Sequence, residues 1–284
     1  MPALLWKGIS LEPKLTDVKR IPPRRPRLTV VAVALAVAII LLSIQLPPST
    51  LLGKADVVGY AICHRIPEHS FTLDGRYFPL CARCTGTFLG AVVGLTAMLL
   101  RRRQRAAGLP PVSIMGVLVG FSGFWAFDGL NSYTTLFPGA PYLYEPRNWL
   151  RLTTGMLNGL ALISFTFPIF NFTLWQKPAQ ERVIKSIWEL VAILPVVALL
   201  IYVIQAEIAV VLYPLAIISS LGVVLLLTLI NSMIATIVLG REGYARMWLQ
   251  ALVPLTVGAA MAILQITAMV LLRVYLTTKL GLPF

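Results

Sequence analysis

The chain has 284 residues, of which 58% are hydrophobic and only 12% are charged, and its formal net charge at pH 7 is +13. In soluble domains about a quarter of all residues are charged, so this composition excludes a soluble enzyme and a disordered chain. The mean hydropathy of +0.83 and several long apolar runs predict an all-α fold, a polytopic bundle of transmembrane helices.

Seven apolar segments are long enough to cross a hydrocarbon core of about 30 Å, which takes about 20 residues of helix. In chain order they cover residues 28–46, 84–100, 113–134, 149–175, 186–205, 208–239 and 247–272. Pro195 and Pro254 fall inside the fifth and the seventh of them. The first segment follows basic residues and has no clear cleavage site, so it is predicted to be an anchor helix and not a removed signal peptide.

The basic residues are distributed unevenly along the chain. Sixteen of the 24 lysines and arginines precede the first span or lie in the loops after the second, fourth and sixth spans. Cytoplasmic loops of membrane proteins are rich in lysine and arginine, so the N-terminus is predicted inside and the C-terminus outside. This places the protein in the cytoplasmic (inner) membrane, with the lipid bilayer as its partner and with no nucleic acid.

The sequence divides into three parts on this basis. Residues 1–27 are a basic cytoplasmic segment, residues 28–175 a four-span core, and residues 176–284 a three-span extension. The core includes a long outer loop, residues 47–84, in which residues 51–62 have apolar side chains at helical spacing. That spacing predicts a short helix on the outer membrane surface.

All the thiols and imidazoles of the chain lie in this loop. They are Cys63, His64, His69, Cys81 and Cys84. A Cys-x-x-Cys turn sets two sulfurs close enough to share one tetrahedral ion, and Cys63 supplies a third. The predicted metal site is therefore Cys63, His64, Cys81 and Cys84, with zinc or a similar divalent metal as the cofactor.

The same residues are compatible with other chemistry. On an oxidising face of the membrane, Cys81 and Cys84 could form a redox pair that passes electrons to a quinone, or Cys63 could form a structural disulfide with one of them. A third alternative is a non-catalytic accessory subunit, whose partners would be other membrane protein subunits. The sequence identifies no catalytic residue, no haem signature and no nucleotide-binding loop.

A second polar group is predicted within the membrane, below the loop. Its members are Asp128, Asn131, Arg147 and Arg151. Antiparallel third and fourth spans would set Asp128 and Arg151 at similar depth, where the two charges could pair. This group is predicted either to line a polar pocket or to hold two helices together. The glycines at 86, 90 and 94 of the second span are predicted to pack closely against a neighbouring helix.

Several short motifs together resemble a family of predicted bacterial polytopic membrane proteins of unknown function. The resemblance covers about residues 51–160, and its motifs read CHRIPEHSF, CARCTG, FDG and NWLRLTTG. The residues that match the family pattern are Cys63, His64, Pro67, Ser70, Phe71, Cys81, Arg83, Cys84, Gly86, Asp128, Gly129, Asn148, Arg151 and Gly155. His69 departs from the pattern, which has arginine at this place. The resemblance implies that the cysteines and the Asp128–Arg151 group belong to one site, and it implies no reaction.

Overall fold

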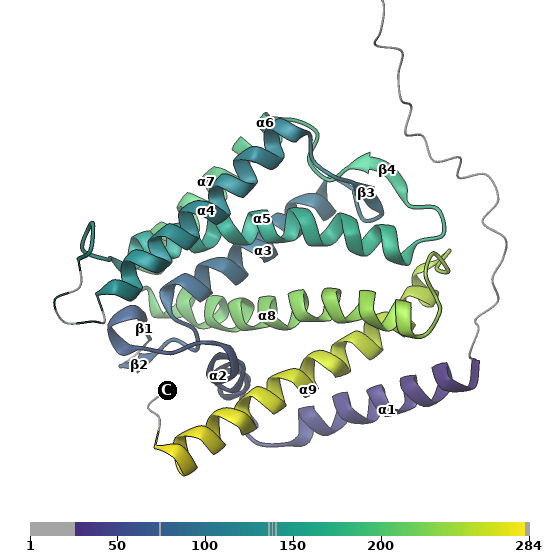
Figure 1. Ribbon diagram of the computed structural model, residues 1–284, viewed down its shortest axis with the longest axis horizontal. Coiled ribbons are helices and arrows are strands. Elements are labelled where there is room, and N and C mark those ends of the chain that lie inside the picture. Colours follow the sequence, from purple (N-terminus) through teal and green to yellow (C-terminus); the bar gives the residue numbers. More distant parts are fainter. Residues whose placement is uncertain (1–25, 74, 136, 138, 140, 282–284) are drawn as a thin grey trace, which may run out of the picture.

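The computed structural model describes residues 26–73, 75–135, 137, 139 and 141–281. The predicted basic segment, apart from its last two residues, lies outside the described residues. The described chain is a bundle of α-helices (Figure 1). The helices are α1 Pro26–Gln45, α2 Leu51–Ile62, α3 Ala82–Leu100, α4 Val112–Thr134, α5 Asn148–Leu174, α6 Ile187–Val191, α7 Leu194–Gln205, α8 Ala209–Val238 and α9 Trp248–Leu280.

Seven helical segments of the described chain are long and apolar enough to cross a membrane, which confirms the predicted bundle. Apart from α2, the remaining described elements are short. One is a 3-10 turn, Pro67–His69, and two are strand pairs, the antiparallel β1 Thr72–Leu73 with β2 Arg76–Tyr77 and the parallel β3 Ala106–Gly108 with β4 Ala179–Arg182.

Two helices differ from the predicted spans. The fifth span consists of α6 and α7, and the break between them lies at residues 192–193, because Pro195 has no N–H group to donate to the Val191 carbonyl and continue α6. The seventh span was predicted to end at residue 272, but α9 continues to Leu280 and is capped by the left-handed Gly281 (φ 63°). Residues 273–280, in which polar and apolar side chains are mixed, contain no helix breaker and continue the helix as far as Gly281.

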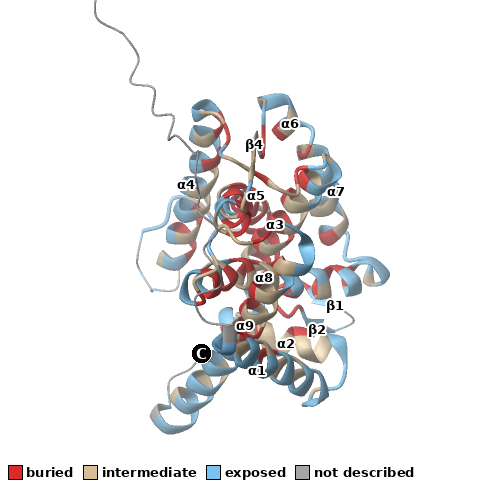
Figure 2. Ribbon diagram, turned by 90° about the vertical axis from the view of Figure 1, so that its right-hand side faces the viewer, coloured by how far each residue is buried: buried red, intermediate tan, exposed pale blue. Residues whose placement is uncertain are grey.

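Helices α3 and α5 form the centre of the bundle, and α5 carries more buried residues than any other described helix (Figure 2). A Cβ atom added at Gly86 or Gly90 of α3 would overlap the backbone of α5, and one at Gly155 or Gly159 of α5 would overlap the backbone of α3. The two helices therefore touch backbone to backbone. This confirms the close packing predicted for the glycines of the second span, although the glycines on α5 were not predicted to share it.

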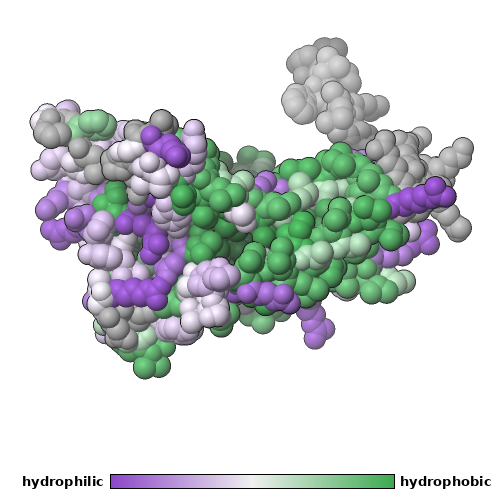
Figure 3. Space-filling model, turned by 90° about the horizontal axis from the view of Figure 1, so that it is seen from below, coloured by the Kyte–Doolittle hydropathy of each residue, from purple (hydrophilic) through white to green (hydrophobic). Residues whose placement is uncertain are grey.

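The other long helices surround this pair. Helix α4 packs on α5, α8 packs on α3 and α5, α9 packs on α8, and α1 lies outermost against α9 (Figure 1). Seen from the α1–α9 side, the middle of the surface is apolar and hydrophilic side chains gather toward its ends (Figure 3). Such a band is the surface expected of a protein whose middle faces lipid.

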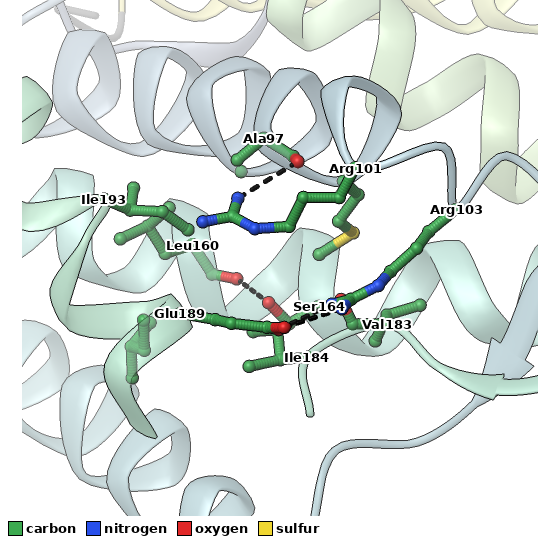
Figure 4. Close-up of a pocket in the computed structure, with 12 residues that line it drawn as sticks. Ala97, Arg101, Arg103, Leu160, Ser164, Val183, Ile184, Glu189 and Ile193 are labelled. Carbon is green, nitrogen blue, oxygen red and sulfur yellow. Dashed lines mark hydrogen bonds and ion pairs between the residues drawn. The ribbon is translucent and has the colours of Figure 1, made fainter. Parts of the chain in front are cut away.

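The two ends of the bundle carry different structures (Figure 1). Helix α2 and the hairpin β1–β2 lie at one end, and the pair β3–β4 lies at the other. Near β3–β4 the buried Arg103 forms a two-pronged ion pair with Glu189 at 2.6 Å and donates to the Val183 carbonyl at 2.9 Å (Figure 4). This contact holds the end of α3 against the start of the fifth span.

Candidate metal centre and its polar cluster

The three cysteines converge although they come from separate parts of the chain. The sulfurs of Cys63, Cys81 and Cys84 all lie within 4.8 Å of one another, and all three are free thiols. In a tetrahedral zinc site with bonds of about 2.3 Å, neighbouring sulfurs are about 3.8 Å apart. The described sulfurs are thus close to the separation that one ion requires.

Helix α2 places Cys63 at this position. Thr50 caps the helix by accepting a hydrogen bond from the Gly53 N–H, and Cys63 is the C-terminal cap residue. A Cβ atom at Gly59 would overlap the Pro79 carbonyl, so only glycine lets the end of α2 lie against the segment that leads into Cys81. The short helix predicted for residues 51–62 is thereby confirmed as a helix, and its packing explains how Cys63 reaches the other two cysteines.

The loop between Cys63 and Cys81 is tied back to α2 by charge. Asp56 on α2 pairs with Arg65 at 3.0 Å and also with Arg76 in the β1–β2 hairpin. Beneath the hairpin, Phe71 and Phe78 are buried with their rings edge to face, 6.4 Å between centroids. The loop is therefore a packed structure that fixes the approach to Cys81.

Cys81 and Cys84 lie at the start of α3, with Cys81 as the N-cap residue. The Cys81 N–H donates a hydrogen bond to the Cys63 sulfur at 3.2 Å. Hydrogen bonds from the side chains of Cys81 and Cys84 hold the pKa of the Cys63 thiol far below its usual range, although burial acts in the opposite direction. The contact with Cys63 in turn raises the pKa of the Cys81 thiol to about 11, so the cluster favours one thiolate, at Cys63; the thiolate is the form that binds a metal.

The two histidines lie outside the sulfur cluster. His64 is exposed, and neither of its ring nitrogens lies within 4.8 Å of all three sulfurs. His69 is partly buried; burial and the nearby charges of Arg151 and Arg83 lower its pKa to about 4. The imidazole of His69 is thus neutral at pH 7 and lies near the polar residues of α3 and α5.

A polar cluster, buried except for the half-buried Arg83 and Tyr144, adjoins the cysteines. It consists of Arg83, Asp128, Asn131, Ser132, Tyr144, Arg151 and Thr154, from α3, α4, α5 and the loop before α5. Arg83, which stands between Cys81 and Cys84 in the sequence, binds the Asp128 carboxylate at 2.5 Å and the Ser132 hydroxyl at 2.9 Å. Asp128 itself is completely buried.

Asp128 was predicted to pair with Arg151, but its observed ion-pair partner is Arg83. Arg151, also buried, donates to Asn148 at 2.8 Å and approaches Ser132 at 3.4 Å. The two guanidinium groups therefore meet at the Ser132 hydroxyl. Asp128 and Arg151 do belong to one cluster, but sequence spacing could not show that α3 turns Arg83 toward α4.

The loop before α5 closes the cluster. Tyr144 donates its hydroxyl to Asp128 at 2.7 Å, while Asn131 accepts from the Leu143 N–H and donates to the Tyr144 carbonyl. Burial, reinforced by the Asp128 carboxylate, raises the pKa of Tyr144 to about 12, so the hydroxyl stays protonated at pH 7. Arg147, the fourth residue predicted for this group, is exposed at the N-cap of α5.

Comparison with known proteins shows the family to which this region is similar. Residues 63–165 match the family described as "Predicted membrane protein (DUF2085)". An uncharacterized protein of Methanothermobacter thermautotrophicus is 34% identical over 106 residues, which are 37% of this chain and 84% of that protein. An uncharacterized protein of Methanocaldococcus jannaschii is 29% identical over 116 residues, which are 41% of this chain and 68% of that protein. No solved structure matches the chain.

The matched region begins at Cys63 and ends within α5. It includes all three cysteines and every member of the polar cluster, whereas α6 to α9 lie outside it. The protein of Methanothermobacter thermautotrophicus is matched over most of its own length. The chain therefore belongs to the DUF2085 family of predicted membrane proteins.

Proposed function

We propose that this protein binds one zinc ion, or a similar divalent metal, through the sulfurs of Cys63, Cys81 and Cys84. The observation that carries the proposal is the convergence of the three free thiols within 4.8 Å from two separate elements, α2 and the start of α3. Thiolate sulfur is the ligand type that zinc favours in closed protein sites. Three protein ligands leave the fourth position of a tetrahedral ion for an exogenous ligand such as water.

The charges around the cysteines support a bound metal. The polar cluster has two guanidinium groups, those of Arg83 and Arg151, but a single carboxylate, that of Asp128. It thus holds one unbalanced positive charge, and a buried unbalanced charge is unfavourable. A divalent ion with three thiolates carries one negative charge, and Arg83 lies between two of these thiolates in the sequence. The metal centre and the polar cluster would therefore neutralise each other.

In this proposal His64 is not required as a ligand. Its ring lies outside the sulfur cluster, and the residue is exposed next to Cys63 at the end of α2. The polar cluster supports the site from below: it fixes the start of α3, and with it Cys81 and Cys84, against α4 and α5. Its role is to orient the ligands, as residues around metal centres commonly do.

We further propose that the metal centre lies on the outer side of the cytoplasmic membrane. The described basic residues at 101–105 and at 177–185 lie at the β3–β4 end, away from α2 and the cysteines (Figure 1). Because basic loops stay in the cytoplasm, this charge distribution favours an outer position for the cysteine loop.

Metal analysis of the purified full-length protein tests the proposal. The wild type is expected to contain about one metal ion per chain, and Cys63→Ser, Cys81→Ser and Cys84→Ser are each expected to lose it. His64→Ala is the matched control and is expected to retain the metal. A wild-type protein without stoichiometric metal, in which thiol trapping finds a Cys81–Cys84 disulfide, would contradict the proposal and favour a thiol oxidoreductase.

A further inference from the structure

The last helix reaches the cysteine loop from the opposite end of the sequence. Beyond its apolar part, α9 carries Arg273, whose Nη1 donates to the carbonyl oxygens of Tyr60 and Cys63, each at 2.6 Å. Its Nη2 lies 3.4 Å from the His64 carbonyl. One side chain of the C-terminal extension therefore holds the backbone of a candidate metal ligand.

The chemistry of this contact is favourable. The last carbonyl groups of a helix have no partner within the helix and carry partial negative charge, so a cation there is stabilising. The Arg273 guanidinium also lies over the Tyr60 ring, 4.5 Å from its centroid. Tyr60 and Cys63 are three residues apart, so the Nη1 group of Arg273 bridges two carbonyl oxygens of the final turn of α2 and fixes where the helix ends.

Packing alone does not fix this end of α2. A cavity of about 210 Å³ lies beside Arg273, between the last turn of α2 and the apolar side chains of Met269, Leu272 and Leu276. Cys63 and His64 line the same cavity. On this side of α2 there is space, so here the hydrogen bonds from Arg273 hold the Cys63 backbone, while on the other side the Cys63 side chain is buried and Gly59 packs against Pro79.

We propose that Arg273 is a positioning residue of the metal centre, which makes the C-terminal extension part of that centre. The inference rests on the proposed function. Cys81 and Cys84 are held by α3 and the polar cluster, whereas Cys63 arrives on a separate helix and must be set at bonding distance from them. Arg273 sets the position of Cys63 by donating a hydrogen bond to its carbonyl oxygen. Arg273 lies outside residues 63–165, the part of the chain that matches the family.

The test measures metal affinity and the geometry of the bound metal in full-length variants. Cobalt(II) is the probe, because its absorption bands report the number and arrangement of thiolate ligands. Arg273→Gln removes the charge and the fork, Arg273→Lys keeps the charge, and Lys279→Gln is the control, an exposed cation on the same helix. Zinc affinity is measured in parallel by competition with a chelator.

We expect Arg273→Gln to weaken zinc binding by about 10- to 100-fold, the usual effect of removing a residue that orients a ligand, and to change the cobalt spectrum. Arg273→Lys is expected to recover part of the affinity, and Lys279→Gln to behave as the wild type. A purely structural role would lower the thermal stability of the metal-free protein and leave the cobalt spectrum of the folded fraction unchanged.

The outcomes separate the two proposals. If the wild type binds cobalt through three thiolates and both Arg273 variants give the same affinity and spectrum, Arg273 does not position Cys63 and the inference fails. If the wild type binds neither zinc nor cobalt, the proposed function itself fails. Should Arg273→Gln not fold, Arg273→Lys decides the question, since wild-type affinity together with a wild-type spectrum in this variant overturns the inference.

Discussion

Asp128 shows most clearly how single residues join the cysteine cluster to the membrane bundle. It is fully buried, and its two carboxylate oxygens accept from Arg83 and Tyr144. Burial of an ion inside a membrane protein is tolerated when the charge is paired and hydrogen bonded. Asp128 therefore fixes Arg83, and through Arg83 the start of α3 where Cys81 and Cys84 lie.

We predict that Asp128→Asn lowers the free energy of unfolding by about 3–5 kcal/mol, because it leaves the Arg83 guanidinium without its counter-ion. Tyr144→Phe removes only one hydrogen bond to the same carboxylate and is expected to lower it by about 1 kcal/mol. Chemical unfolding of both variants in detergent checks the difference. Equal losses would show that the ion pair contributes no more than the tyrosine hydroxyl.

The sequence predicted many of the residues of the site, but not which of them pair with one another. The sequence placed Cys63, Cys81 and Cys84 in one loop, and the three sulfurs do lie together. It could not predict that Arg83 and not Arg151 pairs with Asp128, since that depends on how α3 is rotated about its axis. Tyr144 and Ser132 join the cluster through tertiary contacts that have no sequence periodicity.

At the scale of helices, the contact between α3 and α5 determines how rigidly the site is held. Four glycines let the two backbones touch. In a membrane, where apolar side chains gain little from packing on each other instead of on lipid, such close contact is a main source of helix association.

We predict that Gly159→Ala lowers the free energy of unfolding by about 1–3 kcal/mol, because its methyl group would overlap the Thr87 carbonyl on α3. Gly123→Ala on α4 is the control: a Cβ atom there meets nothing within 4 Å. It is expected to leave stability unchanged or to raise it by up to about 1 kcal/mol. Thermal unfolding of the two variants compares them, and a neutral Gly159→Ala would contradict the close contact.

Helix positions were more predictable than helix ends. The length of the apolar segments alone located all seven spans, because the thickness of the bilayer sets how many apolar residues a spanning helix needs. The extra turns of α9 were missed because polar and apolar side chains are mixed in them, although they carry Arg273 to the end of α2. The break before Pro195 could have been predicted from the proline itself.

For the whole molecule, the fold sets two polar ends on an apolar middle (Figure 3). The cysteine loop occupies one end, and the basic loops around β3 and β4 occupy the other (Figure 1). The sequence predicted this separation from loop charges. It could not predict that α8 and α9 pack around the family-like core and contact α2, since contacts between residues some 200 positions apart leave no local signal.

The proposed orientation predicts which loops face the outside of the cell. Leu143→Cys and Leu109→Cys introduce exposed thiols at the α2 end and at the β3–β4 end, where the native side chains are 76% and 44% exposed. A membrane-impermeant maleimide is expected to label Leu143→Cys in intact cells and Leu109→Cys only after lysis. The parent protein gives the background from the native cysteines, and the reverse pattern would show the opposite orientation.

X-ray absorption spectroscopy at the zinc edge of the purified full-length protein shows whether three cysteine sulfurs bind one zinc ion. We expect a shell of three sulfurs at about 2.3 Å from the metal, completed by one lighter atom at about 2.0–2.1 Å. A shell of nitrogen and oxygen alone, or a protein without zinc whose cysteine sulfurs are joined at about 2.05 Å, would contradict this expectation.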